Sequence, residues 1–587
     1  MFKRLLQILL IVFVSLPVNA QTDSIINGKK DESLLSGLKF SGSIQSDVLI
    51  PEKDRKIRTG EHSNWALSNT YADLRLANRH IEIGGRFQFT EHPLPGYEKE
   101  FKGWGVPYFY VKGHLKRAEL TLCDFYEQFG SGLILRCYEE RELGVDNALR
   151  GGRFILRPIE GLQVKLIGGK QRRYWHHNKS FVYGGDIEME LSHWIKPLRN
   201  RNTILTIGLS GVSKHESDED ILSIRPTGEK DAYDADIIGA YKLHLPKNTG
   251  AFDIRADLQT SRWHLLAEYA QKSHDPSFDN GYTYRHGKTL LLSASYSRKG
   301  LSALLQAKRS EDMNFRSRRS QTGNSSFINN LPAFTMEHTY FLASSYPYAT
   351  QNVPGEWAFQ GSLSYNFIRH TLLGGKYGTL IRINASHTRG IKTNPLCDMN
   401  GEPITDLKGT KGYNTSFWKW GTHSYYHDIN IQFEKKISKN FKLNGMFMNQ
   451  LYNTSVIEGE GETVHANIFV LEGNFSISRK VKLRCETQYL RTKQDEGDRL
   501  YGLIELSLPP HFMFTLSDEW CKRVSEAKNT DLTHAVHYYM ASIAYTHASH
   551  SLIVGYGRTA DGYNCTGGVC RWQPAQKGLQ LSYTFTF

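Results

Sequence analysis

The sequence lacks most of the features that would mark a helical membrane protein or a chain of small soluble domains. Its seven cysteines are spread over 587 residues, which is too sparse for a disulfide-dense scaffold. After residue 20, no apolar run reaches the roughly 20 residues that a membrane-spanning helix needs. No linker, low-complexity tract or charged tail divides the chain, although it is too long for one ordinary soluble core. These absences favour one large repetitive architecture, and a closed barrel fits because only helices and closed barrels satisfy the backbone in lipid.

The first twenty residues have the layout of a secretory signal peptide. Lys3 and Arg4 precede an apolar stretch that ends near Val18, and small residues follow at a suitable cleavage point. An N-terminal anchor helix is disfavoured because the apolar stretch is too short. The expected organisation is a signal peptide over 1–20, a periplasmic lead-in over 21–37 and a transmembrane β-barrel over 38–587. Strands that begin near Leu38 leave no room for the N-terminal plug domain of ligand-energised receptors.

Apolar and polar residues alternate strictly in many short segments, which predicts strands with one apolar and one polar face. Residues 290–297 and 301–308 alternate on either side of the turn 298–300, as in an antiparallel hairpin. The same pattern recurs over residues 481–489, 504–516 and 539–556. In a membrane barrel the polar face would line the lumen and the apolar face would contact lipid.

Connections between the expected strands fall into two classes. Short turns are expected near residues 77–80, 158–161, 297–300, 437–440, 478–480 and 509–510, and long polar connections over residues 91–105, 215–232, 273–288, 310–330, 388–423 and 558–577. This alternation is typical of bacterial outer-membrane barrels, whose short turns face the periplasm. Residues 245–250 and 259–262 both look short, so one is an external turn or the strand register is wrong there. We expect a single large antiparallel barrel of about 22–26 strands, with an even total.

The C-terminal strand carries the most specific pattern. Apolar residues alternate with polar ones from Leu579 to the final residue, and Tyr583, Phe585 and Phe587 lie on the apolar face. On a soluble edge strand these residues would promote aggregation. In a barrel the strand pairs with the first one, and the terminal Phe resembles the signal that the barrel-assembly machinery reads.

Several segments resemble a known family. They are Asp124–Arg136, Tyr138–Arg141, Asp146–Arg153, Tyr346–Gln351 and Gly567–Trp572. Together they resemble an uncharacterised family of Bacteroidota outer-membrane barrels that carries the designation domain of unknown function, and the resemblance spans most of the mature chain. It implies a fold and a location but no activity and no functional residues. The first three segments are also loosely similar to sugar and alginate export porins.

Paired charges concentrate between residues 124 and 153. The candidate lumen or constriction residues are Asp124, Glu127, Arg136, Glu140, Arg141, Asp146, Arg150 and Arg153. Facing rows of Arg and carboxylate would filter solutes by charge and size. The alternative is a structural network in which Arg–carboxylate pairs hold an internal loop and seal the lumen.

Other polar clusters are weaker candidates. Cys565 and Cys570 are a candidate loop disulfide, because Thr-Gly-Gly-Val lies between them, whereas a zinc site lacks further ligands. Two basic clusters, residues 170–179 and 309–319, could bind lipopolysaccharide phosphates or anionic solutes. The simpler interpretation is solvated surface. His176 and His177 would point to opposite faces of a strand, so no metal is expected.

The sequence therefore predicts an outer-membrane β-barrel, either a porin-like channel or facilitator for small or anionic solutes, or a sealed barrel that acts as a scaffold in a secretion or assembly complex. The expected partners are outer-membrane lipid, lipopolysaccharide, the barrel-assembly machinery and an unidentified protein. No nucleic acid and no cofactor are expected. No catalytic motif is present, so an enzyme is not expected.

Overall fold

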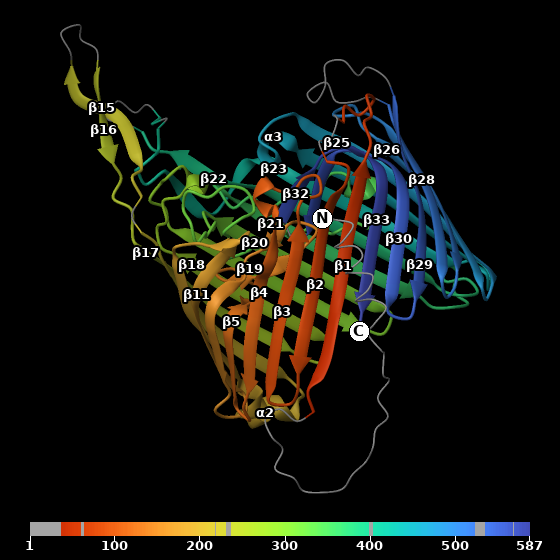
Figure 1. The fold of residues 1–587 in the computed structure, drawn as a ribbon, viewed down its shortest axis with the longest axis horizontal. Coiled ribbons are helices and arrows are strands. Elements are labelled where there is room, and N and C mark those ends of the chain that lie inside the picture. Colours follow the sequence, from red (N-terminus) through yellow and green to blue (C-terminus); the bar gives the residue numbers. More distant parts are fainter. Residues whose placement is uncertain are drawn as a thin grey trace, which may run out of the picture. The chain divides into compact units, whose positions relative to one another are not determined.

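The computed structural model describes residues 37–587 except residues 60–63, 218, 231–235, 398–402, 405, 523–534 and 567–568. The expected signal peptide and nearly all of the lead-in lie outside the described residues. The chain separates into two compact units, Met1–Leu38 and Lys39–Phe587. All of the described strands belong to the second unit, which is a β-barrel (Figure 1).

The described residues form a closed antiparallel barrel of 24 strands, which confirms the predicted fold class. The barrel strands are β1 Lys39–Pro51, β2 Leu67–Ala77, β3 Ile81–Thr90, β4 Gly103–His114, β5 Ala118–Phe125, β10 Leu149–Leu156, β11 Leu162–Arg173, β13 Phe181–Glu190, β14 Ile204–His215, β17 Asn248–Gln259, β18 Trp263–Lys272, β19 Gly287–Arg298, β20 Leu301–Glu311, β21 Gly355–Phe367, β22 Thr379–Pro395, β23 Tyr413–Lys436, β24 Phe441–Asn453, β25 Thr463–Ser478, β26 Val481–Arg491, β27 Arg499–Leu508, β28 Phe512–Cys521, β29 Val536–His547, β30 His550–Thr559 and β33 Gln576–Thr586.

Smaller elements occupy the connections. They are the strands β6 Glu127–Gln128, β7 Arg136–Cys137, β8 Glu139–Glu140, β9 Val145–Asp146, β12 His176–His177, β15 Leu222–Lys230, β16 Asp236–Lys242, β31 Gly562–Thr566 and β32 Val569–Gln573, the 3-10 turns η1 Lys99–Phe101, η2 Leu191–His193, η3 Phe278–Asn280 and η4 Leu342–Ser344, and the short helices α2 Lys196–Asn200 and α3 Thr454–Ile457. Among the described residues, no helix is long and apolar enough to span a membrane.

The first and last strands close the barrel. Val48 of β1 is the register partner of Leu581 of β33, and Ile44 is the partner of Phe585. In Figure 1 the two strands lie side by side at the front. The C-terminal strand is therefore paired on both sides, so the barrel sheet formed by the described residues has no open edge.

Short turns and long connections sort to opposite ends of the barrel, as predicted. The turns 299–300, 479–480 and 509–511 lie at what we call the short-turn end. The connection 216–247 is long because it carries the β15–β16 hairpin, which projects at the upper left in Figure 1. The turn at 260–262 is therefore the short one, and residues 243–247 belong to the long connection. This resolves the ambiguous stretch in the sequence.

The expected long loop over residues 388–423 is wrong. Residues up to Pro395 belong to β22, and β23 begins at Tyr413. The register between these strands shifts several times from Thr388 to Thr393. Such bulges break the period-2 pattern, so the extended ends of the two strands could not be recognised from alternation.

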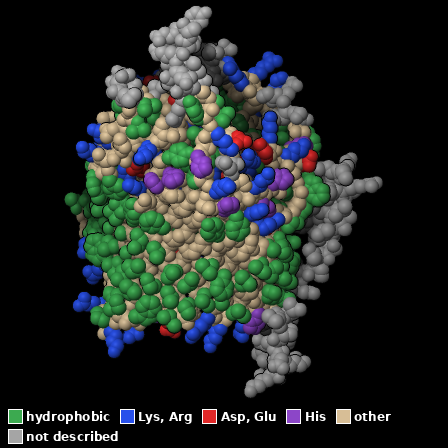
Figure 2. Space-filling view, turned by 90° about the vertical axis from the view of Figure 1, so that its left-hand side faces the viewer, with side chains coloured by type: hydrophobic (Ala, Val, Ile, Leu, Met, Phe, Trp, Pro, Cys, Tyr) green, Lys and Arg blue, Asp and Glu red, His purple; other side chains and the backbone are tan. Residues whose placement is uncertain are grey.

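The outer face of the barrel carries large apolar side chains. Leu209 of β14 and its register partner Ile254 of β17 are about half exposed, at 52% and 51%. Figure 2 shows hydrophobic side chains spread over the lower part of one face, with Lys, Arg and His side chains gathered above them. This distribution is that of a barrel whose outer face contacts lipid.

Candidate functional site: a lumen filled from one end by two loops

Two long connections fold back into the lumen from the long-loop end. We call residues 126–148 the first inner loop and residues 312–354 the second inner loop. Buried apolar side chains of both loops pack together and against inward-facing wall residues. The loop members are Phe129, Leu133, Ile134, Leu135, Cys137, Met313, Phe315, Ile328, Leu331 and Phe334, and the wall members are Leu149, Ile167, Val182, Val212, Ala251, Ala270, Leu291 and Ala358. The lumen therefore contains an apolar core, in contrast to the water-filled lumen of a general porin.

The Phe-Gly-Ser-Gly segment of the first inner loop contacts the wall through its backbone. Gly130 and Gly132 have φ angles of 50° and 90°, which glycine adopts without strain. The Ser131 amide donates to both carboxylate oxygens of Glu268 on β18, at 3.2 and 3.1 Å. A Cβ atom at Gly130 would lie 2.6 Å from Glu268 Oε1. The glycines thus allow the loop backbone to contact a charged wall residue.

Arginine–carboxylate pairs hold the first inner loop to strands β2 and β3. Arg86 of β3 contacts Asp73 of β2 at 2.7 Å and Glu139 of the loop at 2.7 Å. Arg141 of the loop contacts the same two carboxylates, at 2.5 and 2.8 Å. Arg86 also reaches Asp146 at 3.3 Å. Burial raises the pKa of the Glu139 carboxyl, although the nearby Arg86 favours its charged form.

Four of the sequence-predicted residues thus lie in pairs between loop and wall. Besides Arg141 and Asp146, Arg153 of β10 contacts Glu127 at 3.3 Å, and Lys165 of β11 contacts the same carboxylate at 3.3 Å. These ion pairs hold the first inner loop to the barrel wall, and charge-assisted hydrogen bonds strengthen them.

Arg136 and Glu140 differ from the other candidates. Neither makes an ion pair with any residue that the structure describes. The Arg136 guanidinium lies 4.6 Å from the centre of the Tyr138 ring. Of the predicted constriction residues, these two therefore carry charges that no ion pair among the described residues neutralises.

Asp124 and Arg150 are not lumen residues, and this expectation is wrong. They are register partners on β5 and β10 and form an ion pair at 2.7 Å. Leu149, the neighbour of Arg150, is fully buried in the lumen core, whereas Phe154, four residues further on, is exposed. Side chains alternate along a strand, so Arg150 shares the outer face with Phe154. The sequence did not reveal which face each residue occupies, because the strand contains Gly151 and Gly152 and has no clear alternation.

Three lumen-facing lysines bind the backbone of the second inner loop. Lys214 of β14 donates to the Arg316 carbonyl at 2.8 Å, and Lys272 of β18 donates to the Asn314 carbonyl at 2.5 Å. Lys308 of β20 donates to the Pro332 carbonyl at 2.6 Å. The three side chains are at most 1% exposed. Nearby carboxylates compensate two of these charges, Asp275 for Lys214 at 3.0 Å and Glu356 for Lys308 at 2.8 Å.

The remainder of the second inner loop is fastened to the opposite wall. Gln488 of β26 accepts from the Leu342 amide at 2.8 Å, and Gln450 of β24 donates to the Tyr346 carbonyl at 3.0 Å. Tyr346 is also buried in a second apolar cluster with side chains from β23 to β27. The loop therefore crosses the lumen from the β14–β20 wall to the β23–β27 wall.

The basic cluster at residues 309–319 is part of this buried structure, so the interpretation as solvated surface is wrong for three of its four arginines. Arg309 and Arg319 are 0% exposed and Arg316 is 4% exposed. Arg316 pairs with Asp279 at 2.6 Å, and Arg319 donates to the Pro246 carbonyl at 2.8 Å. A run of arginines in a polar segment gave no sign that the segment folds inward.

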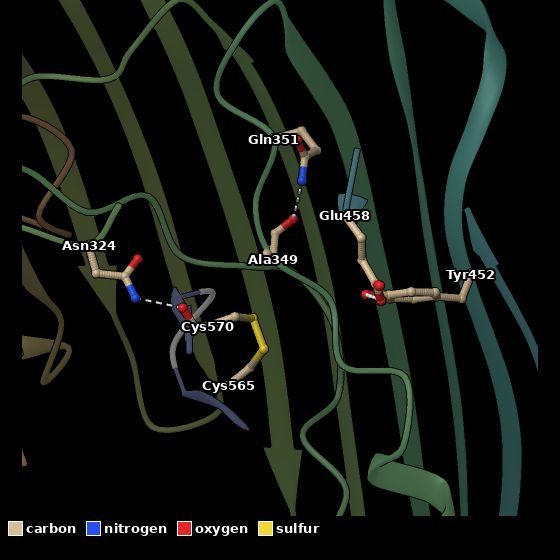
Figure 3. The surroundings of a disulfide bond; sticks show 7 residues. All are labelled: Asn324, Ala349, Gln351, Tyr452, Glu458, Cys565 and Cys570. Atoms are coloured by element: carbon tan, nitrogen blue, oxygen red, sulfur yellow. Dashed lines mark hydrogen bonds between the residues drawn. A yellow bond between two sulfur atoms is a disulfide. The ribbon is translucent and has the colours of Figure 1, made fainter. Parts of the chain in front are cut away.

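A disulfide hairpin covers the same end of the lumen. Cys565 of β31 and Cys570 of β32 form a disulfide. Asn324 of the second inner loop points at this hairpin and donates to the Cys570 carbonyl at 2.6 Å (Figure 3). The Arg571 guanidinium lies 3.8 Å from the centre of the Tyr97 ring, in the connection between β3 and β4. The hairpin thus joins two loops that are far apart in the sequence.

A cavity of about 640 Å³, which we call the lumen cavity, remains beside the second inner loop. Residues 333–348 form one side, strands β27–β29 and β33 form another, and the disulfide hairpin contributes Tyr563 and Cys565. Two of its cationic lining residues are compensated. Arg499 contacts Asp495 at 3.0 Å, and His338 contacts Asp428 at 2.5 Å.

Below the inner loops, toward the short-turn end, the lumen wall is polar and partly exposed. Arg382, Glu434 and Lys442 form a cross-strand row whose side chains are 42%, 25% and 44% exposed. Arg484 and Glu505 extend this lining on β26 and β27. The two halves of the lumen therefore differ, with a packed half at the long-loop end and a solvated half at the short-turn end.

With the geometry established, the sequence comparison decides the family. A model of a family of unknown function, DUF6029, matches residues 1–587. The chain belongs to the DUF6029 family. No curated protein matches the DUF6029 chain in sequence.

Solved structures match this DUF6029 chain only distantly. The siderophore receptor PirA from Pseudomonas aeruginosa is 10% identical with a TM-score of 0.35, over 94% of this chain and 80% of that one. The P pilus usher (PapC) translocation pore is 9% identical with a TM-score of 0.39, over 94% and 99%. OccK11 from P. aeruginosa is 10% identical with a TM-score of 0.31, over 81% and 96%. At this identity the likeness concerns the barrel fold alone.

Proposed function

We propose that the chain is an outer-membrane barrel through which small polar solutes cross, along a path that the two inner loops narrow. One observation carries this proposal. The inner loops fill the long-loop half of the lumen but leave the lumen cavity of about 640 Å³ against β27–β29 and β33. The short-turn half of the lumen is lined by partly exposed charged side chains, which supports a water-filled path on that side.

The width of the barrel explains why the loops matter. Porins of 16–18 strands already leave an aqueous channel, and barrels of about 22 strands are plugged. A barrel of 24 strands with an empty lumen would pass solutes with little discrimination. Fixed loops would restore selection by size and hydrogen bonding. The cationic residues around the lumen cavity are paired, which argues against a strong preference for anions.

The proposed orientation follows from the sorting of the connections. Short turns of bacterial outer-membrane barrels face the periplasm and long loops face outside. In this orientation the inner loops and the disulfide hairpin lie toward the cell exterior, and a solute entering from outside would meet them first.

Single-channel recording tests the proposal. Purified protein in a planar lipid bilayer should give reproducible current steps, with ion selectivity read from reversal potentials in a salt gradient. Arg136→Gln should make the pore less anion-selective or more cation-selective, because Arg136 lacks an ion-pair partner among the described residues. Arg150→Gln is the matched control, because Arg150 lies on the outer face. Absence of steps from protein shown to be folded by heat-modifiable gel mobility would overturn the proposal.

A sealed scaffold barrel is the second candidate, and the fastening of the second inner loop favours it. Buried lysines on three strands and glutamines on two others hold this loop. These five hydrogen bonds indicate that the second inner loop is a permanent part of the lumen. If folded protein is silent in bilayers and a stoichiometric protein partner co-purifies with it, the scaffold proposal replaces the channel.

A further inference from the structure

Three buried polar atoms on the wall of the lumen cavity have no hydrogen-bond partner among the described residues. They are Gln576 Oε1, Gln580 Nε2 and Glu519 Oε2. All three residues line the cavity, and Glu519 is 1% exposed. Buried polar atoms in proteins are nearly always paired, with protein, water or ligand. A molecule bound in the lumen cavity could supply the partners that these three side chains lack.

Aromatic rings line the same cavity. Tyr346 and Phe341 come from the second inner loop, Tyr501 and Tyr538 come from β27 and β29, and Tyr563 comes from the disulfide hairpin. Tyrosine offers an apolar ring face together with a hydroxyl group. A ligand that suits this lining has both hydrogen-bonding groups and apolar C–H surfaces.

The cationic lining residues argue against an anionic ligand. Arg499 is engaged by Asp495 and Glu496, at 3.0 and 3.3 Å. His338 is engaged by Asp428. Burying an anion beside these compensated cations would cost free energy without a free counter-charge. The volume of about 640 Å³ lies within the usual range for small-molecule sites.

We propose that the lumen cavity binds a small polyhydroxylated solute, such as a mono-, di- or trisaccharide. Sugar hydroxyls donate and accept, so they can pair with Gln576, Gln580 and Glu519, while the C–H faces of the sugar pack on the tyrosine rings. The proposal that a sugar binds depends only on the lumen cavity. The proposal that this sugar is also transported rests on the proposed function.

The test combines channel recording with calorimetry on the same purified protein. Glucose, sucrose and raffinose are added to one side of the bilayer, and the duration of current block is measured. Arginine and glutamate serve as charged probes. Titration calorimetry of the detergent-solubilised protein with the same sugars measures binding without requiring a pore.

Gln580→Leu and Gln576→Leu should each shorten sugar block and weaken sugar binding by about tenfold, because each removes a polar group from a buried site. Gln360→Leu is the matched control, since Gln360 lies on the lumen face of β21, away from the cavity, and bonds Asn384 at 3.3 Å. Folding of each variant is checked by heat-modifiable mobility.

The outcomes separate the two proposals. Current steps with sugar block that the glutamine variants weaken would support both. Steps without block, together with no calorimetric binding, would overturn the sugar site and leave the channel standing. Sugar binding without steps would overturn the channel and leave the site. Block that Gln360→Leu weakens as much as Gln580→Leu would overturn the assignment to this cavity.

Discussion

Removing the second inner loop should open the barrel. The loop joins Glu311 to Gly355, which are register partners at the ends of β20 and β21. Residues 313–353 can therefore be replaced by a short Gly-Ser turn without separating the two strands. Lys214, Lys272 and Lys308 would lose their carbonyl partners. Their ammonium groups would then face lumen water, so the wall should tolerate the change.

The size of the effect follows from the dimensions of the barrel. Twenty-four strands that are spaced about 4.8 Å apart and tilted by about 40° form a cylinder about 48 Å in diameter. About 5 Å of side chain on each side leaves an opening of about 1,000 Å². The lumen cavity of about 640 Å³ has a cross-section of about 75 Å² if its three dimensions are equal. Conductance should therefore rise by about tenfold, with the first inner loop limiting the gain.

Single-channel recording in a planar bilayer measures this change, and heat-modifiable mobility shows that the shortened barrel is folded. Deletion of the β15–β16 hairpin, residues 222–242, is the matched control, because that hairpin projects beyond the barrel (Figure 1). A folded loop-excised barrel with unchanged conductance would refute the reasoning, since the loop would then not be what narrows the lumen.

Three further predictions concern the loops and the outer rim. Burial raises the pKa of Asp312, a residue of the second inner loop, to about 6. The Asp312 carboxyl therefore stays protonated to a higher pH in the folded state than in the unfolded state. The free energy of unfolding should fall by on the order of 2–3 kcal/mol as pH rises from about 4 to about 6. Asp312→Asn should remove this slope in denaturant unfolding curves at pH 4, 5 and 7, and a slope that persists would assign it to another group. The double change Cys565→Ala and Cys570→Ala should speed hydrogen exchange in residues 562–573 but not in the wall strands, because a bond closing so short a loop contributes about 2 kcal/mol locally; equal exchange in both proteins would contradict this. Lys170 is exposed on the outer face beside Arg150, whose charge Asp124 compensates. Lys170 is therefore the cation of this pair that can bind a phosphate group, so Lys170→Glu should lower the phosphorylated glycolipid that co-purifies, measured by phosphate analysis. Lys299→Glu at the short-turn end is its control, and equal loss from both variants would argue against a site at Lys170.

The architecture could be predicted from the sequence because its signals are local. Period-2 alternation in segments such as 290–308 requires only neighbouring residues, and it located β19, β20 and the turn between them. The closure of the barrel by the C-terminal strand followed from the alternation up to Phe587. The prediction failed over 388–423, where bulges interrupt the pairing of β22 and β23.

The contents of the lumen could not be predicted in the same way, because they depend on contacts between residues far apart in the chain. Lys214 meets Arg316, 102 residues away, and Asn324 meets Cys570, 246 residues away. Both partners in the first contact are basic residues, and a backbone carbonyl rather than an acidic side chain accepts the bond. One signal was nevertheless available: the Phe-Gly-Ser-Gly segment at 129–132 places glycines beside apolar residues in an otherwise charged connection, which is unusual for a solvated loop.

The contacts between residues far apart in the chain also change how the basic composition is interpreted. A net charge of +13 ordinarily indicates solvated basic surface or attraction of anions. Several of the cations instead lie inside the barrel: Lys214, Lys272, Lys308 and Arg319 are at most 1% exposed, and each donates to a loop carbonyl. A cation used in this way is out of reach of a solute, because it is buried against the loop that it holds. If solutes cross this barrel, hydrogen-bonding groups without partners, such as those of Gln576 and Gln580, are therefore better candidates for recognising them than the residues that give the chain its charge.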